Sequence, residues 1–311
     1  MAIPKRKHPR RDAWFTEISF GNSTWSSLGG IEGDVLAAEI ISKAWEGGIR
    51  YFDTAPYYGS GLCERRLGAG LVWQPRSEFL LSTKVGINLD PFSRRPSVDR
   101  HYPHYAGFAP TCDYSVDGIS MSFETSLHRL GIPSVDIAYM HGLSICDGGI
   151  DAALETGMPA LIELRDDGRT KMIGVGANTP EIAMAFLQRY DIDLLLFAGG
   201  FSLVDHAGAK AVIDLCEKRG TGIIAASPFA SGRYFSPENE AFRHKLKIRC
   251  SEFGIDETAA VVQFGLRQPA VLSVLWSTKT PANIDLTLEA SQQTIPEDFW
   301  LSLKRDGLLY F

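Results

Sequence analysis

The sequence predicts an α/β protein of one domain, and three observations favour a closed (β/α)8 barrel. Its 311 residues suit one such barrel, which takes roughly 250 residues plus insertions. Eight short apolar runs alternate with eight longer amphipathic segments along nearly the whole chain, as βα units require. No G-x-G-x-x-G, the fingerprint of a dinucleotide-binding doubly wound sheet, follows the first apolar run. Alternation alone does not fix closure, so a doubly wound sheet stays the alternative.

The strand candidates are short and apolar, and each is closed by polar or glycine residues. This pattern is typical of strands that are buried on both faces of a parallel sheet. They span Ile18–Asn22, Arg50–Thr54, Phe79–Lys84, Val135–His141, Met172–Ala177, Leu194–Ala198, Gly222–Ala226 and Val271–Trp276.

Helix candidates fill the intervals between these runs. Thr179 before Pro180 predicts an N-cap with proline at the first helical position, and Gly220 after a cationic last turn predicts a helix end. The helices are expected at Asp34–Glu46, Cys63–Val72, Val116–Leu130, Asp151–Asp167, Pro180–Arg189, Ala207–Lys218, Asp256–Arg267 and Pro281–Ala290, with a further one from Glu238.

Three segments fall outside this rhythm. Residues 1–15 contain a basic run, Lys5–Arg11, with no apolar segment after it, which predicts a solvated N-terminal tail rather than a secretory signal. Residues 86–114, rich in Pro, Arg, His and Tyr, form a long insertion after the third strand, expected on the catalytic face. A second irregular stretch is expected at Ser227–Glu240. No linker divides the chain, so residues 1–311 are read as one domain.

Composition excludes several classes of function. The chain is 45% hydrophobic and 22% charged, as in soluble globular proteins. A net charge of −6 argues against a nucleic-acid or anionic-membrane partner, and no apolar run approaches the ~20 residues of a membrane helix. The five cysteines are scattered without a C-x-x-C pair, which disfavours a disulfide framework and a structural zinc, so a cytoplasmic location is expected.

Chemically useful side chains stand where consecutive strands end. The second, third and fourth strands end in Asp53, Lys84 and His141, and Tyr58 follows in the second βα loop. In a barrel these ends open on one face. A tyrosine has a pKa of about 10. A buried ammonium beside it favours phenolate, a paired aspartate keeps that lysine charged, and a histidine orients the substrate oxygen. The set predicts Tyr58 as a proton carrier that needs no metal.

Each of these residues alone has a plainer explanation. An aspartate often caps a helix, a lysine often ends a strand in solvent, and histidine and tyrosine often serve hydrogen bonding or packing. The coincidence of all four at matching strand ends favours the functional interpretation.

These residues closely resemble the aldo-keto reductase family. The family pattern appears as Asp53-Thr-Ala-Pro-Tyr-Tyr58-Gly, Glu64-Arg-Arg-Leu-Gly68, Thr83-Lys84 and Tyr139-Met-His141. The resemblance runs from about Ile18 to Ala290 and implies a (β/α)8 (TIM) barrel. It also implies hydride transfer between NAD(P) and a carbonyl, or its alcohol or lactol. The family spacing from Asp53 selects Tyr58 over Tyr57 as general acid/base.

The resemblance also implies residues that hold the cofactor. Asn178 would bind the nicotinamide carboxamide, although the family's sixth-strand glutamine is absent, and Phe201 would stack on the nicotinamide unless it is a packed barrel aromatic. The Ser-Pro-Leu-x-x-Gly pyrophosphate loop of the family is matched by Ser227-Pro-Phe229-Ala-Ser-Gly232.

The end of the eighth strand bears on the choice between NAD and NADP. NADP-preferring members carry Lys-Ser-x-Thr-Pro-x-Arg there, whereas this chain has Ser277 and Asn283 in place of the two cations. Each charge-assisted hydrogen bond to the 2′-phosphate would be worth about 1.5–3 kcal/mol. Lys279 could restore part of this if it faces inward. NAD is therefore the expected cofactor, with NADP possible.

Within the family, the chain resembles the aldose dehydrogenase branch. The first hypothesis is oxidation of an L-fucose or D-threo-aldose lactol at C1 to the lactone, and the alternative is oxidation of pyridoxal to 4-pyridoxolactone. Trp25, Tyr57 and His141 are the expected substrate contacts. A dinucleotide-binding regulatory protein without turnover is the alternative of another class, and a metal-dependent hydrolase lacks the His-x-His strand that it would need.

Overall fold

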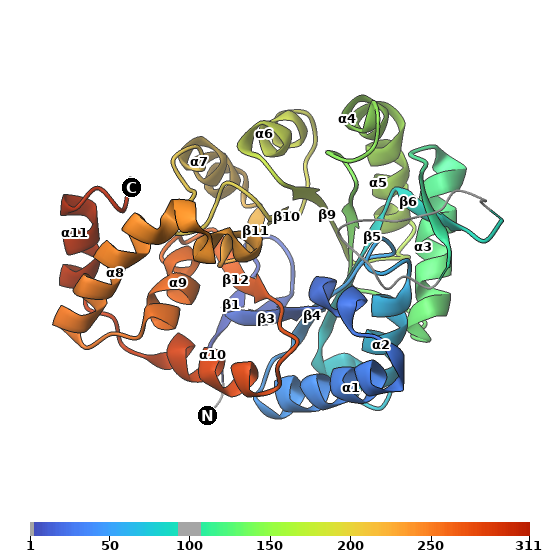
Figure 1. Ribbon diagram of the computed structural model, residues 1–311. Helices are drawn as coiled ribbons and strands as arrows, with labels where there is room; N and C mark the ends of the chain where they lie inside the picture. Colours follow the sequence, from blue (N-terminus) through green and yellow to red (C-terminus); the bar gives the residue numbers. More distant parts are fainter. Residues whose placement is uncertain (1–2, 93–106) are drawn as a thin grey trace.

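The computed structural model describes residues 3–92 and 107–311. Eight parallel strands close into a barrel and helices surround it (Figure 1). Every barrel strand overlaps a predicted one, so the (β/α)8 prediction is confirmed and the doubly wound alternative is excluded. In chain order the barrel strands are β3 Ile18–Gly21, β4 Tyr51–Asp53, β5 Leu80–Val85, β8 Ile137–Met140, β9 Met172–Ala177, β10 Leu194–Phe197, β11 Gly222–Ala226 and β12 Val271–Trp276.

The helices follow the predicted pattern with differences at their ends. The single helix expected at Asp151–Asp167 consists of α4, a π-helical turn at Ala153–Gly157, and α5. The hydroxyl of Thr179 accepts from the Ile182 N–H, as a cap should. The helices are α1 Gly30–Glu46, α2 Leu62–Leu71, α3 Val116–Leu130, α4 Gly149–Ala152, α5 Met158–Asp166, α6 Pro180–Arg189, α7 Lys210–Arg219, α8 Glu240–Phe253, α9 Glu257–Leu266, α10 Ala282–Gln292 and α11 Glu297–Arg305.

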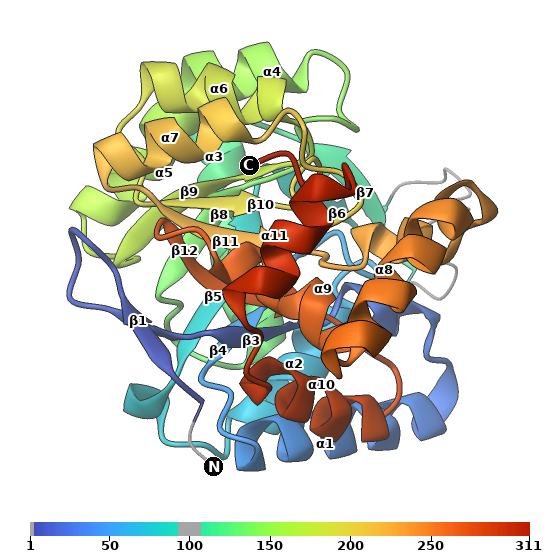
Figure 2. The ribbon, with the colours of Figure 1, turned by 90° about the vertical axis from the view of Figure 1, so that its left-hand side faces the viewer.

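The expected N-terminal tail is instead a hairpin that closes one end of the barrel. Strands β1 Lys5–Lys7 and β2 Trp14–Thr16 pair antiparallel, and Figure 2 shows them at the end of the barrel opposite β6 and β7. Phe15 is fully buried and meets the Tyr51 ring edge-on at 5.2 Å. Arg6 donates to the carbonyl of Val271 at 2.9 Å. The basic run therefore serves the fold, because its cations bind backbone carbonyls that the barrel leaves open.

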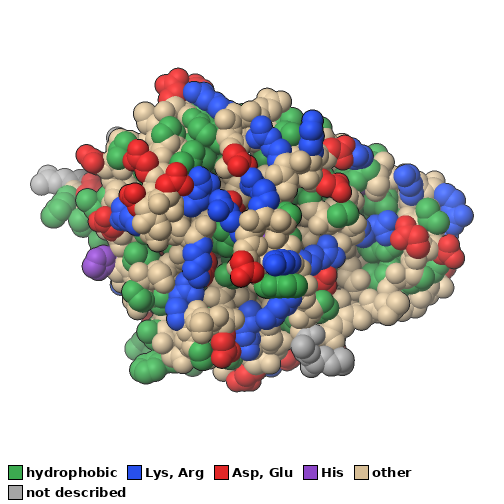
Figure 3. Space-filling view, turned by 180° about the vertical axis from the view of Figure 1, so that it is seen from behind, with side chains coloured by type: hydrophobic (Ala, Val, Ile, Leu, Met, Phe, Trp, Pro, Cys, Tyr) green, Lys and Arg blue, Asp and Glu red, His purple; other side chains and the backbone are tan. Residues whose placement is uncertain are grey.

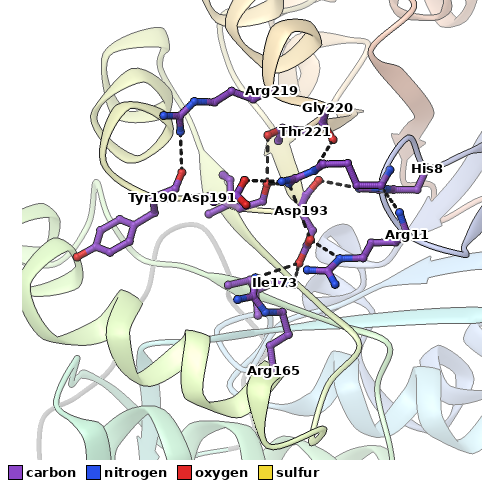
Figure 4. Close-up of polar contacts among 12 residues, drawn as sticks. His8, Arg11, Arg165, Ile173, Tyr190, Asp191, Asp193, Arg219, Gly220 and Thr221 are labelled. Atoms are coloured by element: carbon purple, nitrogen blue, oxygen red, sulfur yellow. Dashed lines mark hydrogen bonds and ion pairs between the residues drawn. The ribbon is translucent and has the colours of Figure 1, made fainter.

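A buried aspartate anchors this hairpin (Figure 4). Asp193 is fully buried and accepts from the Ile173 N–H at 3.0 Å and from Arg11 Nε at 2.6 Å. Arg165 lies 3.7 Å from the same carboxylate, and the His8 ring hydrogen-bonds the Asp193 carbonyl at 2.8 Å. Seen from this end, Lys and Arg side chains gather near the middle of the face with Asp and Glu among them (Figure 3).

The two ends of the insertion after the third barrel strand pair with each other as two antiparallel strands. Strands β6 Ile87–Asp90 and β7 Ala109–Cys112 pair antiparallel, and residues 93–106 of the insertion, with the run Arg100–Tyr105, lie outside the described residues. Cys112 forms a disulfide with Cys146, in the loop after β8, so the expectation against disulfides is wrong. The expected cytoplasmic location thereby loses the support of the cysteine pattern. No helix in the described ranges is long and apolar enough to cross a bilayer.

Candidate active site

The four predicted catalytic residues meet at the carboxyl ends of β4, β5 and β8. Lys84 Nζ donates to Asp53 Oδ2 at 2.6 Å and to the Thr54 carbonyl at 2.8 Å. It lies 4.9 Å from the centroid of the Tyr58 ring. The Tyr58 and His141 rings are nearly perpendicular, with centroids 5.8 Å apart. Parallel strands that end on one face of the barrel thus bring all four side chains together.

A tight turn directly after Tyr58 holds that residue in place. Gly59, Ser60 and Gly61 all have positive φ, at +59°, +49° and +86°. Glycine takes this conformation at little cost. A Cβ on Gly59 would lie 3.1 Å from the Ser26 Cβ, so the close approach of the neighbouring loop also calls for glycine. Helix α2 starts immediately after this turn, and the Cys63 N–H donates to the Tyr58 carbonyl.

The ion pair of Asp53 and Lys84 is buried, with exposed fractions of 2% and 1%. Burial raises the pKa of the Asp53 carboxyl, and the Lys84 ammonium opposes that change. Burial also lowers the pKa of Lys84, against the attraction of Asp53. The 2.6 Å contact and a second donor on Asp53 favour the charged pair. This pair supplies a fixed ammonium beneath the Tyr58 ring.

The electrostatics of Tyr58 and His141 differ from what the sequence led us to expect. Burial raises the pKa of Tyr58, and the Asp53 charge raises it further, whereas the Lys84 ammonium was expected to favour the phenolate. Burial and the Lys84 charge lower the pKa of His141 to about 3. At neutral pH the phenol therefore carries its proton and the imidazole is uncharged.

Three further residues of this network were missed by sequence reasoning. Ser82 donates to Asp53 Oδ1 at 2.6 Å, and behind it Tyr51 and Tyr139 form a hydrogen-bonded pair with oxygens 3.0 Å apart. The available signal was the period of two along a strand, which places Tyr51 and Asp53 on one face of β4 and Ser82 and Lys84 on one face of β5.

Two cavities meet at Tyr58. The first has a volume of about 350 Å³ and is bordered by Asp53, Tyr58 and the ends of β3, β10, β11 and β12. The second, of about 680 Å³, extends from Tyr57, Tyr58 and His141 to the loop after β8. The residues predicted to be catalytic thus lie where the two cavities adjoin.

Most of the predicted cofactor residues border these cavities. The first cavity is lined by Ser227, Phe229, Gly232 and Ser277. The loop from Ser227 to Gly232 is strained, with positive φ at four of its residues, and this kind of turn can present backbone N–H groups to an anion. Asn178, Lys279 and the predicted substrate contact Tyr57 line the second cavity.

Three predicted residues are directed elsewhere. Trp25, expected to contact substrate, is fully buried and donates through Nε1 to the Thr278 carbonyl at 2.9 Å, so its indole supports a loop. Phe201 is 3% exposed and packs on Phe197 and Phe264, as a core aromatic does. Asn283 donates to Thr278 Oγ1 at 3.1 Å. None of the three borders either cavity in the described part of the chain.

Comparison with known proteins agrees with this site. The model of the Aldo/keto reductase family matches residues 17–305. The chain is 32% identical to pyridoxal 4-dehydrogenase from Microbacterium luteolum, over 99% of this chain and 98% of that protein. It is 33% identical to D-threo-aldose 1-dehydrogenase from a Pseudomonas species, over 94% of each chain.

Solved structures share the fold. An aldo-keto reductase from Bacillus halodurans, in its holo form, superposes with a TM-score of 0.76 at 24% identity, over 99% of this chain and 97% of that one. A glycerol dehydrogenase from Gluconobacter oxydans gives a TM-score of 0.76 at 19% identity, over 99% and 96%. The family match and the two relatives above 30% identity confirm the resemblance seen in the sequence. The chain belongs to the aldo/keto reductase family and is an NAD(P)-dependent oxidoreductase.

Proposed function

We propose that the protein oxidises a cyclic hemiacetal to a lactone, with an aldose of the L-fucose or D-threo-aldose type as substrate and NAD as preferred cofactor. The observation that carries this proposal is the second cavity, which meets the phenol of Tyr58 and is bordered by hydroxyl and amide groups. Ser26, Ser27, Ser144 and Asn178 are among them, and such groups suit a polyhydroxylated ring.

Tyr58 is the general base of this oxidation. It takes the proton of the C1 hydroxyl as the C–H electron pair leaves, and the lactone carbonyl forms. Because burial raises the pKa of Tyr58, few molecules hold phenolate at neutral pH, so oxidation should accelerate as pH rises. NAD(P), when bound, accepts the hydride, and its oxidised ring adds a positive charge that favours the phenolate. The buried ion pair of Lys84 and Asp53 keeps the charges beside Tyr58 in fixed positions.

His141 orients the substrate oxygen without changing its own charge. Its pKa of about 3 leaves it neutral, with one N–H. Within the described residues, His141 Nδ1 is buried and makes no hydrogen bond. A buried N–H without an acceptor is rarer and more costly than an unused lone pair. We therefore place the proton on Nε2, as donor to the substrate oxygen.

The cations around the two cavities support the proposed NAD preference. Among the described residues that line them, Lys279 and Arg233 are the cationic ones outside the buried pair. Lys279 Nζ donates to Ser27 Oγ at 3.1 Å, and Arg233 pairs with Asp205 at 2.9 Å. Ser277 faces Thr24 with hydroxyl oxygens 2.7 Å apart, and this neutral pair at the end of β12 supports the proposal that a 2′-phosphate would find little charge there.

The cofactor preference is tested with the double variant Ser277→Lys and Asn283→Arg. Two added charge-assisted hydrogen bonds of about 1.5–3 kcal/mol each should raise kcat/KM with NADP by at least ~100-fold. The wild type should favour NAD. A wild-type kcat/KM that is higher with NADP would contradict this part of the proposal.

The substrate is tested by following NAD reduction with L-fucose, D-arabinose, L-galactose and pyridoxal in parallel. Pyridoxal is the second candidate, since it closes to an internal hemiacetal and the apolar side chains Leu143, Ile145 and Ile182 also border the second cavity. Turnover of an aldose to its lactone supports the first choice. Turnover of pyridoxal alone replaces it, and turnover of neither overturns lactol oxidation.

A further inference from the structure

A chain of three buried hydroxyl groups ends on the catalytic aspartate. Tyr51, Ser82 and Tyr139 are all fully buried. The Tyr139 and Tyr51 oxygens are 3.0 Å apart, the Tyr51 and Ser82 oxygens are 3.0 Å apart, and Ser82 Oγ lies 2.6 Å from Asp53 Oδ1. These residues come from three adjacent barrel strands, β4, β5 and β8.

The direction of each hydrogen bond in this chain follows from counting protons. A carboxylate accepts only, so Ser82 gives its single proton to Asp53. Ser82 must then accept from Tyr51, and Tyr51, having spent its proton, must accept from Tyr139. Hydrogen bonds that run one way polarise one another and strengthen the last bond. The last bond here is the one to Asp53 Oδ1.

Few other groups contact the Asp53 carboxylate, so the bond from Ser82 should matter for its charge. Among the residues that the structure describes, the carboxylate has one ionic partner, Lys84, on Oδ2, and Ser82 is the side-chain donor on Oδ1. The other charged group near Lys84, Glu64, is fully buried and already bonded to Arg129 and to Thr83 Oγ1. The titratable groups that face the pair from the packed elements are Tyr51 on β4, Tyr58 in the following loop, Cys63 and Glu64 on α2, Tyr139 on β8 and His141 after it.

We infer that Ser82, supported by Tyr51 and Tyr139, is a positioning residue that keeps Asp53 ionised and aimed at Lys84, and through that pair sets the pH at which Tyr58 exchanges its proton. Ser82 borders neither of the two cavities, so it acts through Asp53 rather than on substrate. The inference rests on the role proposed for Tyr58 and not on the identity of the substrate.

Removing the serine hydroxyl should weaken the charged pair. In Ser82→Ala, Asp53 loses a donor and Tyr51 loses its acceptor, so the shared proton moves toward the carboxylate and the Asp53 charge is lost more readily. Because that charge raises the pKa of Tyr58, Tyr58 should then lose its proton at lower pH. One hydrogen bond to the Asp53 carboxylate corresponds to about one to two pH units in the titration of Asp53, which limits the effect passed on to Tyr58.

The test is the pH profile of kcat/KM for reduction of 4-nitrobenzaldehyde, a generic aldehyde, by NADH or NADPH. This reaction needs Tyr58 as acid and does not depend on the sugar or pyridoxal assignment. The alkaline fall in activity should move downward by up to about one pH unit in Ser82→Ala and by less in Tyr51→Phe and then in Tyr139→Phe. Ser82→Thr, which keeps the hydroxyl, should restore the wild-type profile.

A matched control separates positioning from structure. Ser273 on β12 is also fully buried, and its hydroxyl lies 2.7 Å from both Ser19 Oγ and the Thr16 carbonyl, not from Asp53. Ser273→Ala should lower the melting temperature without moving the pH profile. A Ser82→Ala profile that matches the wild type overturns the inference, and if that variant does not fold, an unshifted Tyr51→Phe profile does so. Aldehyde reduction without any lactol oxidation would refute the proposed substrate and leave this inference standing.

Discussion

The variant Lys84→Met tests the buried ion pair on which the site is built. It leaves the Asp53 carboxylate 2% exposed with Ser82 as its side-chain donor, and breaking a buried pair typically costs about 3–5 kcal/mol. Proton uptake by Asp53 limits this loss of folding free energy, because it removes the unpaired buried charge. From its ordinary pKa of 3.8, neutralising the carboxyl costs about 1.36 kcal/mol per pH unit, or about 4.4 kcal/mol at pH 7 and about 1.6 kcal/mol at pH 5. The folded variant binds more protons than its unfolded chain, so its deficit should shrink as pH falls.

Urea unfolding, followed by tryptophan fluorescence at pH 7 and pH 5, measures the difference in unfolding free energy between Lys84→Met and the wild type. The expected loss is about 3–4 kcal/mol at pH 7 and about 1–2 kcal/mol at pH 5. The double variant Asp53→Asn and Lys84→Met should recover most of it. Lys43→Met is the matched control, because Lys43 and Asp285 are also 2.6 Å apart but exposed, and it should leave stability nearly unchanged. A small loss that is the same at both pH values, without recovery in the double variant, would refute the reasoning.

Three other predictions concern stability. The pKa of His141 is lowered to about 3, so between pH 6.5 and pH 3 the unfolded chain binds a proton at this residue and the folded protein does not. The free energy of unfolding therefore falls as the pH falls. Urea unfolding should show about 2 kcal/mol of this loss at pH 5, and less in His141→Gln. The disulfide of Cys112 and Cys146 spans 34 residues, so reduction should cost about 3–4 kcal/mol on the chain-entropy model, and a thermal scan of Cys112→Ser should not respond to reductant. Asp193→Asn should lose about 3 kcal/mol by urea unfolding while each folded molecule keeps its kcat, because the buried charge anchors the hairpin and not the site; a lower kcat would contradict that division.

The barrel could be predicted from the sequence because its strands are buried on both faces. Their continuous apolar runs end where the chain turns polar, and the predicted bounds of β9, β11 and β12 coincide with the observed ones. The same rule located Asp53, Lys84 and His141, since the residue that ends a barrel strand faces the site.

What the sequence could not predict depends on contacts between distant segments. The N-terminal hairpin resembled a solvated tail because Arg6 binds carbonyls more than 250 residues away, such as that of Val271. The pairing of Cys112 with Cys146 depends on which loops the barrel makes neighbours. Trp25 stands in the right loop, but its indole turns toward the Thr278 carbonyl. Residue type and strand order cannot give such side-chain directions.

The pKa of Tyr58 was predicted in the wrong direction for a similar reason. The sequence indicated a lysine near the tyrosine and left the degree of burial unknown. In the structure, burial and the Asp53 charge raise the pKa of the phenol. The consequence is a phenol that begins protonated, so the proposed oxidation should speed up as the pH rises.

The most direct test of the account is Tyr58→Phe, measured for turnover and for dinucleotide binding in the same preparation. Loss of the hydroxyl should lower kcat for NAD-linked oxidation by at least ~100-fold, the usual contribution of general acid–base catalysis. The Kd for NAD, followed by quenching of tryptophan fluorescence, should stay within about threefold of the wild type, because the ring remains. Oxidation at a comparable rate in Tyr58→Phe would contradict the claim that this phenol carries the proton.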